Sequence, residues 1–284
     1  MTEPAFQGPA AESRYAAFVR AAERAVIGLD FDGTLAPIVE DPTRARIHPD
    51  APDLLARLAA AVAGVAVVTG RPARQVLDLG GLEEVGDRIG DEGHELRVLG
   101  QYGNERWSSS RRRVVSPPPP RGLAAFERDL PDLLRRHDAA QAYVETKGLA
   151  VAVHTRRLPD PAAAFDRLLP ALTDLAHRYD LAVEPGRLVV EVRGAGVHKG
   201  SAVRALAEEL DAAAFCFIGD DLGDVEAFRA VADLRENGLV GLLVCSGSEE
   251  EATLVALADV VVPGPDGVVS FLARLADDID AARV

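Results

Sequence analysis

Short runs of consecutive apolar residues recur along this chain, and stretches with helical character separate them. The clearest runs are residues 26–29, 64–68 and 214–219. Unbroken apolar runs of this length, alternating with helices, are typical of parallel strands that are buried on both faces. Further strands are expected at 96–99, 106–107, 239–244 and 259–262, with helices at 11–25, 51–63, 199–210, 223–232 and 267–280. The pattern predicts an α/β fold with a doubly wound, mostly parallel sheet.

The rhythm changes in the middle of the chain, where three serines, three arginines and four successive prolines interrupt any regular element. Beyond this break, Gly148 and Pro185-Gly186 are expected to supply the turns of two hairpin-like strand pairs. The elements expected there are helices at 121–137 and 160–179 and strands at 142–145, 149–154, 181–183 and 188–192. We predict a smaller α+β domain at 113–193, inserted between the two parts of the larger domain, 1–112 and 194–284.

The composition is that of a soluble globular protein, with 48% hydrophobic and 27% charged residues. No apolar stretch approaches the roughly 20 residues that a membrane span requires, and the N-terminus lacks a secretory pattern. Cys216 and Cys245 both fall in predicted buried strands. We therefore expect no disulfide and a reducing, cytoplasmic location.

A net charge of −14 disfavours nucleic acid as a partner, because phosphate backbones attract lysine and arginine. The one basic run, Arg111 to Arg113, lies between three serines and the four prolines. We interpret it as a solvated linker and not as a binding surface. The expected partner is a small molecule, with no nucleic acid or membrane, and the chain is expected to be a monomer.

Two carboxylates follow the first buried run, in the segment Asp30-Phe31-Asp32-Gly33. Ligands of open α/β sheets bind beyond the carboxyl ends of the strands, which is where this segment lies. Residues i and i+2 of an extended chain point the same way, so Asp30 and Asp32 can face one site. Taken alone, the segment is equally compatible with a solvated strand end that carries an Asp-Gly turn.

Three more carboxylates, Asp220, Asp221 and Asp224, follow the buried run at 214–219. Carboxylates this close repel one another unless a cation is present, and Mg²⁺ prefers oxygen ligands. We predict that Asp220 binds Mg²⁺ directly and that Asp221 or Asp224 completes or supports the coordination. One of the three is also expected to act as the N-cap of the following helix.

Two further positions suit a phosphate group. Thr69 ends a predicted strand and is followed by Gly70 and Arg71, so it offers a hydroxyl with backbone amides nearby. Lys199 lies at a helix start, where the helix N-terminus favours an anion. Either residue alone is compatible with a structural role, but four strand-end or helix-start segments in this order are far more specific.

The order of these segments resembles that of the haloacid dehalogenase superfamily of phosphatases, and the long insert between Thr69 and Lys199 resembles its inserted α/β cap. More narrowly, the chain is similar to the trehalose-6-phosphate phosphatases. The similarity extends from about residue 25 to 275 and rests on the segments LDFDGTLAPIV, VVTGRP, Glu145-x-Lys147-Gly148, EPGRLVVEVR, HKG and GDDLGD.

The resemblance implies Mg²⁺-dependent hydrolysis of trehalose 6-phosphate. Asp30 would attack phosphorus and form an aspartyl-phosphate, with Asp32 as general acid and base. The backbone carbonyl of Asp32 would join Asp30 and Asp220 around the metal. The phosphoryl oxygens would be bound by Thr69, Gly70, Arg71 and Lys199. The residues expected to bind the sugar are Glu105, Glu145, Lys147, Arg187 and Glu191.

Four positions depart from the family pattern: Tyr102 stands where histidine is usual, Arg187 where lysine is common, Gly223 where threonine is usual, and Gly194 where a proline often follows the cap arginine. None removes a group that the chemistry needs. The alternatives are a related capped phosphatase for another sugar or glycerate phosphate, a phosphohexose mutase, and an inactive regulator that binds sugar phosphate. The regulator predicts loss of Asp30, Asp32 or the Asp220 segment, and all of them are present.

Overall fold

The computed structural model describes residues 4–186, 188–247 and 252–283. The chain forms two compact units, one made of residues through Ser116 together with those from His198 onward, the other of Pro117–Val197. The junctions fall at 117 and 198, where the sequence predicted 113 and 194. The second junction lies later because Gly194, the last residue of β9 (Val189–Gly194), and the three residues after it also belong to the smaller unit.

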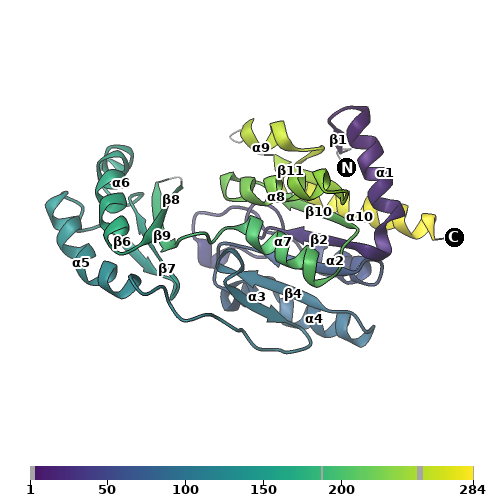
Figure 1. The fold of residues 1–284 in the computed structure, drawn as a ribbon, viewed down its shortest axis with the longest axis horizontal. Helices are drawn as coiled ribbons and strands as arrows, with labels where there is room; N and C mark the ends of the chain where they lie inside the picture. The colour runs from purple at the N-terminus through teal and green to yellow at the C-terminus, as the bar shows by residue number, and fades with distance from the viewer. Residues whose placement is uncertain (1–3, 187, 248–251, 284) are drawn as a thin grey trace. The chain divides into compact units, whose positions relative to one another are not determined.

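The larger unit is built on one eight-stranded sheet in the order β1-β12-β11-β10-β2-β3-β4-β5 (Figure 1). The strands from β12 to β4 run parallel, and the edge strands β1 and β5 are antiparallel to their neighbours. This confirms the predicted doubly wound α/β fold. The strands are β1 (Ala5–Phe6), β2 (Ala25–Leu29), β3 (Gly64–Val68), β4 (Leu96–Gly100), β5 (Glu105–Ser108), β10 (Ala214–Gly219), β11 (Val240–Gly247) and β12 (Val260–Pro263).

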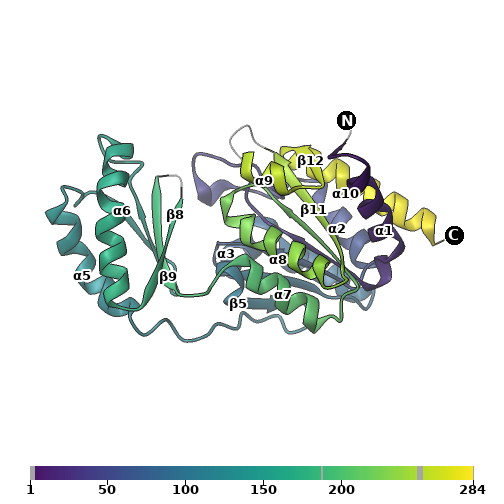
Figure 2. The same cartoon turned by 45° about the horizontal axis from the view of Figure 1, so that its top comes forward.

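Helices cover both faces of this sheet and enclose two apolar cores (Figure 2). On one face lie α1 (Pro9–Arg20), α2 (Ala51–Ala59), α3 (Ala73–Gly80), α4 (Leu82–Asp91) and α10 (Gly264–Ala282). On the other lie α7 (Lys199–Glu209), α8 (Val225–Glu236) and α9 (Ala252–Leu257). Short 3₁₀ helices are η1 (Ala22–Arg24), η2 (Pro42–Arg44), η3 (Gln101–Gly103) and η4 (Leu222–Asp224). Cys216 and Cys245 are buried, as predicted.

The smaller unit is a four-stranded antiparallel sheet, order β6-β7-β9-β8, with two helices on one face. Its elements are α5 (Leu123–Arg136), β6 (Tyr143–Thr146), β7 (Ala150–His154), α6 (Pro161–Arg178), β8 (Leu181–Gly186) and β9 (Val189–Gly194). The two predicted hairpins are present. The expected turn at Pro185-Gly186 is wrong, because both residues lie in β8 and pair with β9. The apolar side chains of alternate strand positions face α5 and α6, which leaves the opposite face polar.

The strand order places the predicted site. β2 lies between β10 and β3 and runs parallel to both, so the three carboxyl ends meet at one edge of the sheet. The residues that follow these strands are Asp30, Thr69 and Asp220. Within the described residues, no helix is long and apolar enough to cross a bilayer.

Candidate active site

Three buried carboxylates, Asp30, Asp220 and Asp224, converge at the carboxyl edge of the sheet. Each offers an oxygen, and the three oxygens lie within 4.8 Å of one another. Lys199 Nζ lies 2.7 Å from Asp30 Oδ1 and 2.7 Å from Asp224 Oδ1, so the ammonium group bridges two of the three. Four residues from three distant segments of the sequence, all predicted as site residues, therefore form one charged cluster.

Glycine is required where the loop after β2 passes Asp220. Gly33 has φ 72°, and a Cβ at this position would lie 2.0 Å from Asp220 Oδ2. The Ser246 hydroxyl, at the end of β11, donates a 2.6 Å hydrogen bond to the Gly33 carbonyl. Ser246 is a buried residue that the sequence analysis missed, because only the pairing of β11 with β10 brings it next to this loop.

The electrostatics of the cluster are dominated by burial. Burial raises the pKa of Asp220 to about 10, with Asp30 and the other carboxylates adding to the shift. Burial is also the largest cause of the raised pKa values of Asp30 and Asp224, although Lys199 opposes the shift in both. Burial alone lowers the pKa of Lys199, but Asp224 and Asp30 outweigh it and hold that pKa well above its usual value. With all three carboxylates ionised, the cluster would carry more negative charge than its single lysine balances.

The donor set fits a hard divalent cation. Within the described residues, the buried Asp220 Oδ1 has no hydrogen-bond partner, which is costly unless something else binds it. Oxygen donors from two or three carboxylates suit Mg²⁺, and a bound cation favours the ionised form of each carboxylate. Asp30, Asp220 and Asp224 are therefore the side chains that would hold the metal.

Asp221 was predicted as a further ligand and lies outside this cluster. Its carboxylate accepts a 2.8 Å hydrogen bond from the Gly223 backbone amide and forms a capping box with Asp224 at the start of η4. Asp221 is also exposed, in contrast to Asp220 and Asp224. It is the residue of the three that serves as the N-cap, as the sequence analysis expected of one of them.

Addition of Mg²⁺ is expected to raise the thermal unfolding midpoint of the metal-free protein. A ligand of the folded state at 100 times its Kd stabilises by about 2.7 kcal/mol, which corresponds to roughly 5–10 °C for a domain of this size. Asp220→Asn should lose most of the shift, whereas Asp211→Asn, at an exposed site, should keep it. Differential scanning fluorimetry measures both, and equal shifts in the two variants would place the metal elsewhere.

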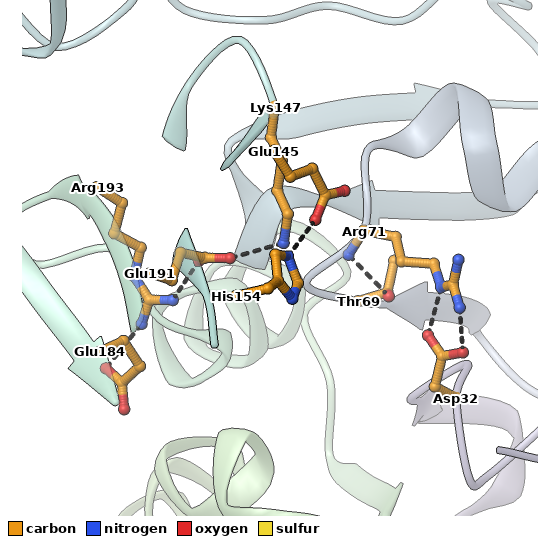
Figure 3. A network of polar contacts seen from close by, with 9 residues as sticks. All are labelled: Asp32, Thr69, Arg71, Glu145, Lys147, His154, Glu184, Glu191 and Arg193. Atoms are coloured by element: carbon orange, nitrogen blue, oxygen red, sulfur yellow. Dashed lines mark hydrogen bonds and ion pairs between the residues drawn. The ribbon is translucent and has the colours of Figure 1, made fainter. Parts of the chain in front are cut away.

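Asp32 lies beside the cluster and is bound by Arg71 (Figure 3). Arg71 Nε and Nη2 donate to the two carboxylate oxygens at 2.5 and 2.6 Å, and Nη1 donates to the Pro42 carbonyl at 2.9 Å. Arg71 was predicted to bind phosphate, and the structure gives its guanidinium to Asp32 instead. Its backbone amide donates to Thr69 Oγ1 at 3.2 Å, which fixes the hydroxyl of the Thr69-Gly70-Arg71 loop.

The turn after β4 supports that loop. The Tyr102 amide donates to the Thr69 carbonyl at 2.9 Å. The Tyr102 side chain also packs against Gly70, where a Cβ would lie 2.8 Å from Tyr102 Oη. Glu105, predicted to bind substrate, accepts from the Ala73 amide at 2.6 Å and from Gln101 Nε2 at 2.8 Å. Glu105 therefore orients the start of α3 in the larger unit.

A second polar cluster covers the helix-free face of the smaller unit (Figure 3). Glu191 is buried and forms ion pairs with Lys147 Nζ at 2.7 Å and with Arg193 Nη1 at 3.0 Å. On the same face, His154 Nε2 lies 3.0 Å from Glu145 Oε2. The structure thus brings together three of the predicted sugar-binding residues, Glu145, Lys147 and Glu191, and Arg187 lies outside the described residues.

Arg193 and Glu184 belong to this cluster and were missed as site residues. Arg193 Nη2 lies 3.0 Å from Glu184, so Arg193 bridges two glutamates. Glu184, Glu191, Ala152 and Glu145 are directly opposite one another across the four strands. The spacing of Glu191 and Arg193 in β9 could have predicted that Arg193 belongs to this cluster, since residues i and i+2 of a strand share a face.

This arrangement, a carboxylate cluster at the parallel edge of a doubly wound sheet and a separate antiparallel insert, is the fold of capped haloacid dehalogenase-like hydrolases. A solved structure of the C-terminal domain of trehalose-6-phosphate phosphatase from Candida albicans superposes with a TM-score of 0.73 at 22% identity. The superposition covers 97% of this chain and 98% of that one.

The family follows from sequence. The trehalose-phosphatase family model matches residues 28–260, and the chain belongs to this family. A probable trehalose-phosphate phosphatase of Sinorhizobium fredii is 31% identical over 252 residues, covering 87% of this chain and 86% of that protein. An uncharacterized glycosyl hydrolase of Mycobacterium tuberculosis is 35% identical over 270 residues, covering 91% of this chain. The chain spans only 19% of the length of that relative.

Proposed function

We propose that this protein hydrolyses trehalose 6-phosphate to trehalose and inorganic phosphate through a covalent phosphoenzyme, with the help of Mg²⁺. The observation that carries the proposal is the cluster of Asp30, Asp220, Asp224 and Lys199, which combines a strand-end carboxylate, a cation and a metal-binding donor set. Membership of the trehalose-phosphatase family supports the disaccharide as the leaving group.

Asp30 is the proposed nucleophile. One of its carboxylate oxygens attacks phosphorus, the bond from phosphorus to the sugar oxygen breaks, and an aspartyl-phosphate forms. Water then attacks this phosphorus and releases phosphate, which regenerates the carboxylate. The contact with Lys199 fixes the rotamer of Asp30 and supports the ionised form that attack requires.

Asp32 is the proposed general acid and base, two residues further along the loop. It would donate a proton to the departing sugar oxygen and later remove one from the attacking water. In the structure both of its oxygens accept from Arg71. Proton transfer by Asp32 therefore requires at least one of these two contacts to open during the cycle.

The transferring phosphoryl group would be bound by Lys199 and by the hydroxyl and backbone amides of the Thr69-Gly70 segment. Stabilisation of the charge on the phosphoryl oxygens is the main demand that phosphoryl transfer makes on a protein. Mg²⁺, held by Asp30, Asp220 and Asp224 with the Asp32 carbonyl as a further donor, would neutralise part of this charge. Asp221 is better assigned to the η4 cap than to the metal.

The polar face of the smaller unit is the proposed sugar-binding surface, with Glu145, Lys147 and Glu191 as its main residues. A carboxylate accepts several hydrogen bonds, so it suits a ligand covered with hydroxyl groups. Arg193 would position Glu191 for this task, since it holds one of its oxygens at 3.0 Å. Arg187 is retained as a proposed sugar contact on the family resemblance alone.

The main alternative is a phosphatase that acts on another sugar phosphate. It would use the same chemistry with a different sugar-binding surface. An inactive regulator is not favoured, because the nucleophile, the cation and the metal donors form one intact cluster. A reducing, cytoplasmic location is also proposed, on the ground that the chain has only two cysteines and both are buried, in β10 and β11.

Glu191→Ala is expected to lower kcat/KM for trehalose 6-phosphate roughly ten- to a hundred-fold, the usual cost of a lost hydrogen bond to a charged group. Hydrolysis of p-nitrophenyl phosphate, which has no sugar, should change by less than about two-fold. Asp166→Ala, an exposed carboxylate on α6 of the same unit, serves as the matched control. Steady-state kinetics on both substrates decide, and equal losses on the two would contradict the assignment of Glu191 to the sugar.

A further inference from the structure

A hollow of about 580 Å³ lies at the β5 edge of the large sheet, and none of the residues that line it belongs to the carboxylate cluster. Its floor is formed by residues of β4, β5 and α7, and Arg106 of β5 donates to Glu209 of α7 there. Leu99 and Leu206 make part of the floor apolar. A volume of this size is typical of sites for small organic ligands.

The hollow is basic, although the chain as a whole is acidic. Arg97, Arg106, Arg111 and Arg113 line it, against two carboxylates, Glu95 and Glu209. The formal charge of this lining is +2, from four arginines and two glutamates, in a chain of net charge −14. A local excess of positive charge on an acidic protein attracts a compact anion, while the surrounding charge repels an extended one such as nucleic acid.

Two of the four arginines are held by carboxylates and two are not. Glu209 lies 3.1 Å from Arg106 and 3.6 Å from Arg97, which also pairs with Glu95 at 2.6 Å. In the part of the chain that the structure describes, neither Arg111 nor Arg113 forms an ion pair within 4.0 Å, and Arg111 acts on Glu95 only through a longer-range charge interaction. These two guanidinium groups are therefore the ones that can turn to an incoming anion. The neighbouring hydroxyl groups of Ser108 and Ser110 lie 3.2 Å apart, and Ser110 donates to Glu95.

The segment that carries Arg111 and Arg113 is fixed to the sheet. The backbones of Arg106 and Val115 exchange two hydrogen bonds, of 2.9 and 2.8 Å, and the Ser109 amide donates to the Leu96 carbonyl at 3.0 Å. The sequence favours a solvated linker for the basic run, and its three arginines are exposed. Two of them, Arg111 and Arg113, also line the hollow, whereas Arg112 pairs with Asp87 of α4 and lies outside the lining.

We propose that this hollow binds a small organic polyphosphate. Arginine forks bind phosphate oxygens in pairs, and the apolar floor accommodates a ring or hydrocarbon portion of the ligand. The site is separate from the one that would process a phosphate monoester. The polyphosphate proposal therefore does not depend on the proposed phosphatase function.

The test is isothermal titration calorimetry of adenosine triphosphate, with Mg²⁺ in excess so that the carboxylate cluster keeps its metal. Arg111→Ser combined with Arg113→Ser is expected to weaken binding at least ten-fold. Arg112→Ser removes a charge from the same segment without touching the hollow, and it should leave the affinity within about two-fold. Adenosine, which lacks the phosphates, should not bind to the wild-type protein.

Two results would overturn the proposal: no binding of adenosine triphosphate to the wild-type protein at millimolar concentration, or equal affinity in the wild-type protein and the double variant. The second result would place the anion elsewhere, for instance at the carboxylate cluster. Phosphate release from the phosphatase substrate in the absence of adenosine triphosphate should be the same in the double variant and the wild-type protein. That measurement shows that the fold is intact and separates this proposal from the proposed function.

Discussion

Asp30→Asn is expected to reduce phosphate release by about 10⁴-fold or more, which is the scale of loss when a covalent nucleophile is removed. The amide has nearly the same shape as the carboxylate, so the loss comes from chemistry and not from packing. Burial already raises the pKa of Asp30, and Lys199 keeps its contact with Asp224 when the charge of Asp30 is removed, so the substitution should cost little stability. The variant should unfold at a temperature close to that of the wild-type protein.

Acid quenching during turnover provides the matching direct evidence. In the wild-type protein, mass spectrometry should find one phosphoryl group on the peptide that contains Asp30, and in Asp30→Asn that peptide should stay unmodified. Recovery of a phosphoryl group on a different residue, or activity above a tenth of the wild-type value, would contradict the role given to Asp30.

Lys199→Met should damage both stability and activity, because this buried ammonium group faces two buried carboxylates. Removal of one partner of a buried ion pair typically costs about 3–5 kcal/mol, and removal of a phosphate-binding charge about 10²–10³-fold in kcat. Arg204→Met, on the same helix, breaks an exposed pair with Asp233 and should cost less than about 1 kcal/mol.

The stability deficit of metal-free Lys199→Met should depend on pH. The pKa values of Asp30 and Asp224 are raised in the folded protein, so the folded state binds more protons than the unfolded state above the ordinary pKa of aspartate. Stability contributed by such groups falls as pH rises, and loss of Lys199 removes the group that opposes the shift. Urea unfolding at pH 5 and pH 8 should show the larger deficit at pH 8; a deficit independent of pH would contradict this.

The sequence predicted the larger fold and the cluster because both depend on a simple rule. Parallel strands that are buried on both faces appear as unbroken apolar runs, and their carboxyl ends share one edge of the sheet. Asp30, Thr69 and Asp220 could therefore be brought together without knowledge of any contact. The helices α3 and α4 were missed because glycines at 80, 81, 86 and 90 weaken the helical signal.

The parts that could not be predicted depend on the partners of polar side chains. Arg71 could equally bind a phosphate or Asp32, and only the position of the loop after β2 decides. Glu105 is a carboxylate in a family motif, yet it accepts from the amide of Ala73, which precedes it by 32 residues. Arg193 and Glu184 meet through the register of β8 and β9, which the sequence does not specify.

The central claim is a Mg²⁺-dependent phosphatase whose substrate is trehalose 6-phosphate. The most direct test is phosphate release from trehalose 6-phosphate, glucose 6-phosphate, sucrose 6-phosphate and mannosyl-3-phosphoglycerate, each with Mg²⁺ and with a chelator. We expect kcat/KM to be highest for trehalose 6-phosphate and the activity to disappear with the chelator. Preference for another substrate in this panel would contradict the disaccharide, and no release from any of them would contradict the phosphatase itself.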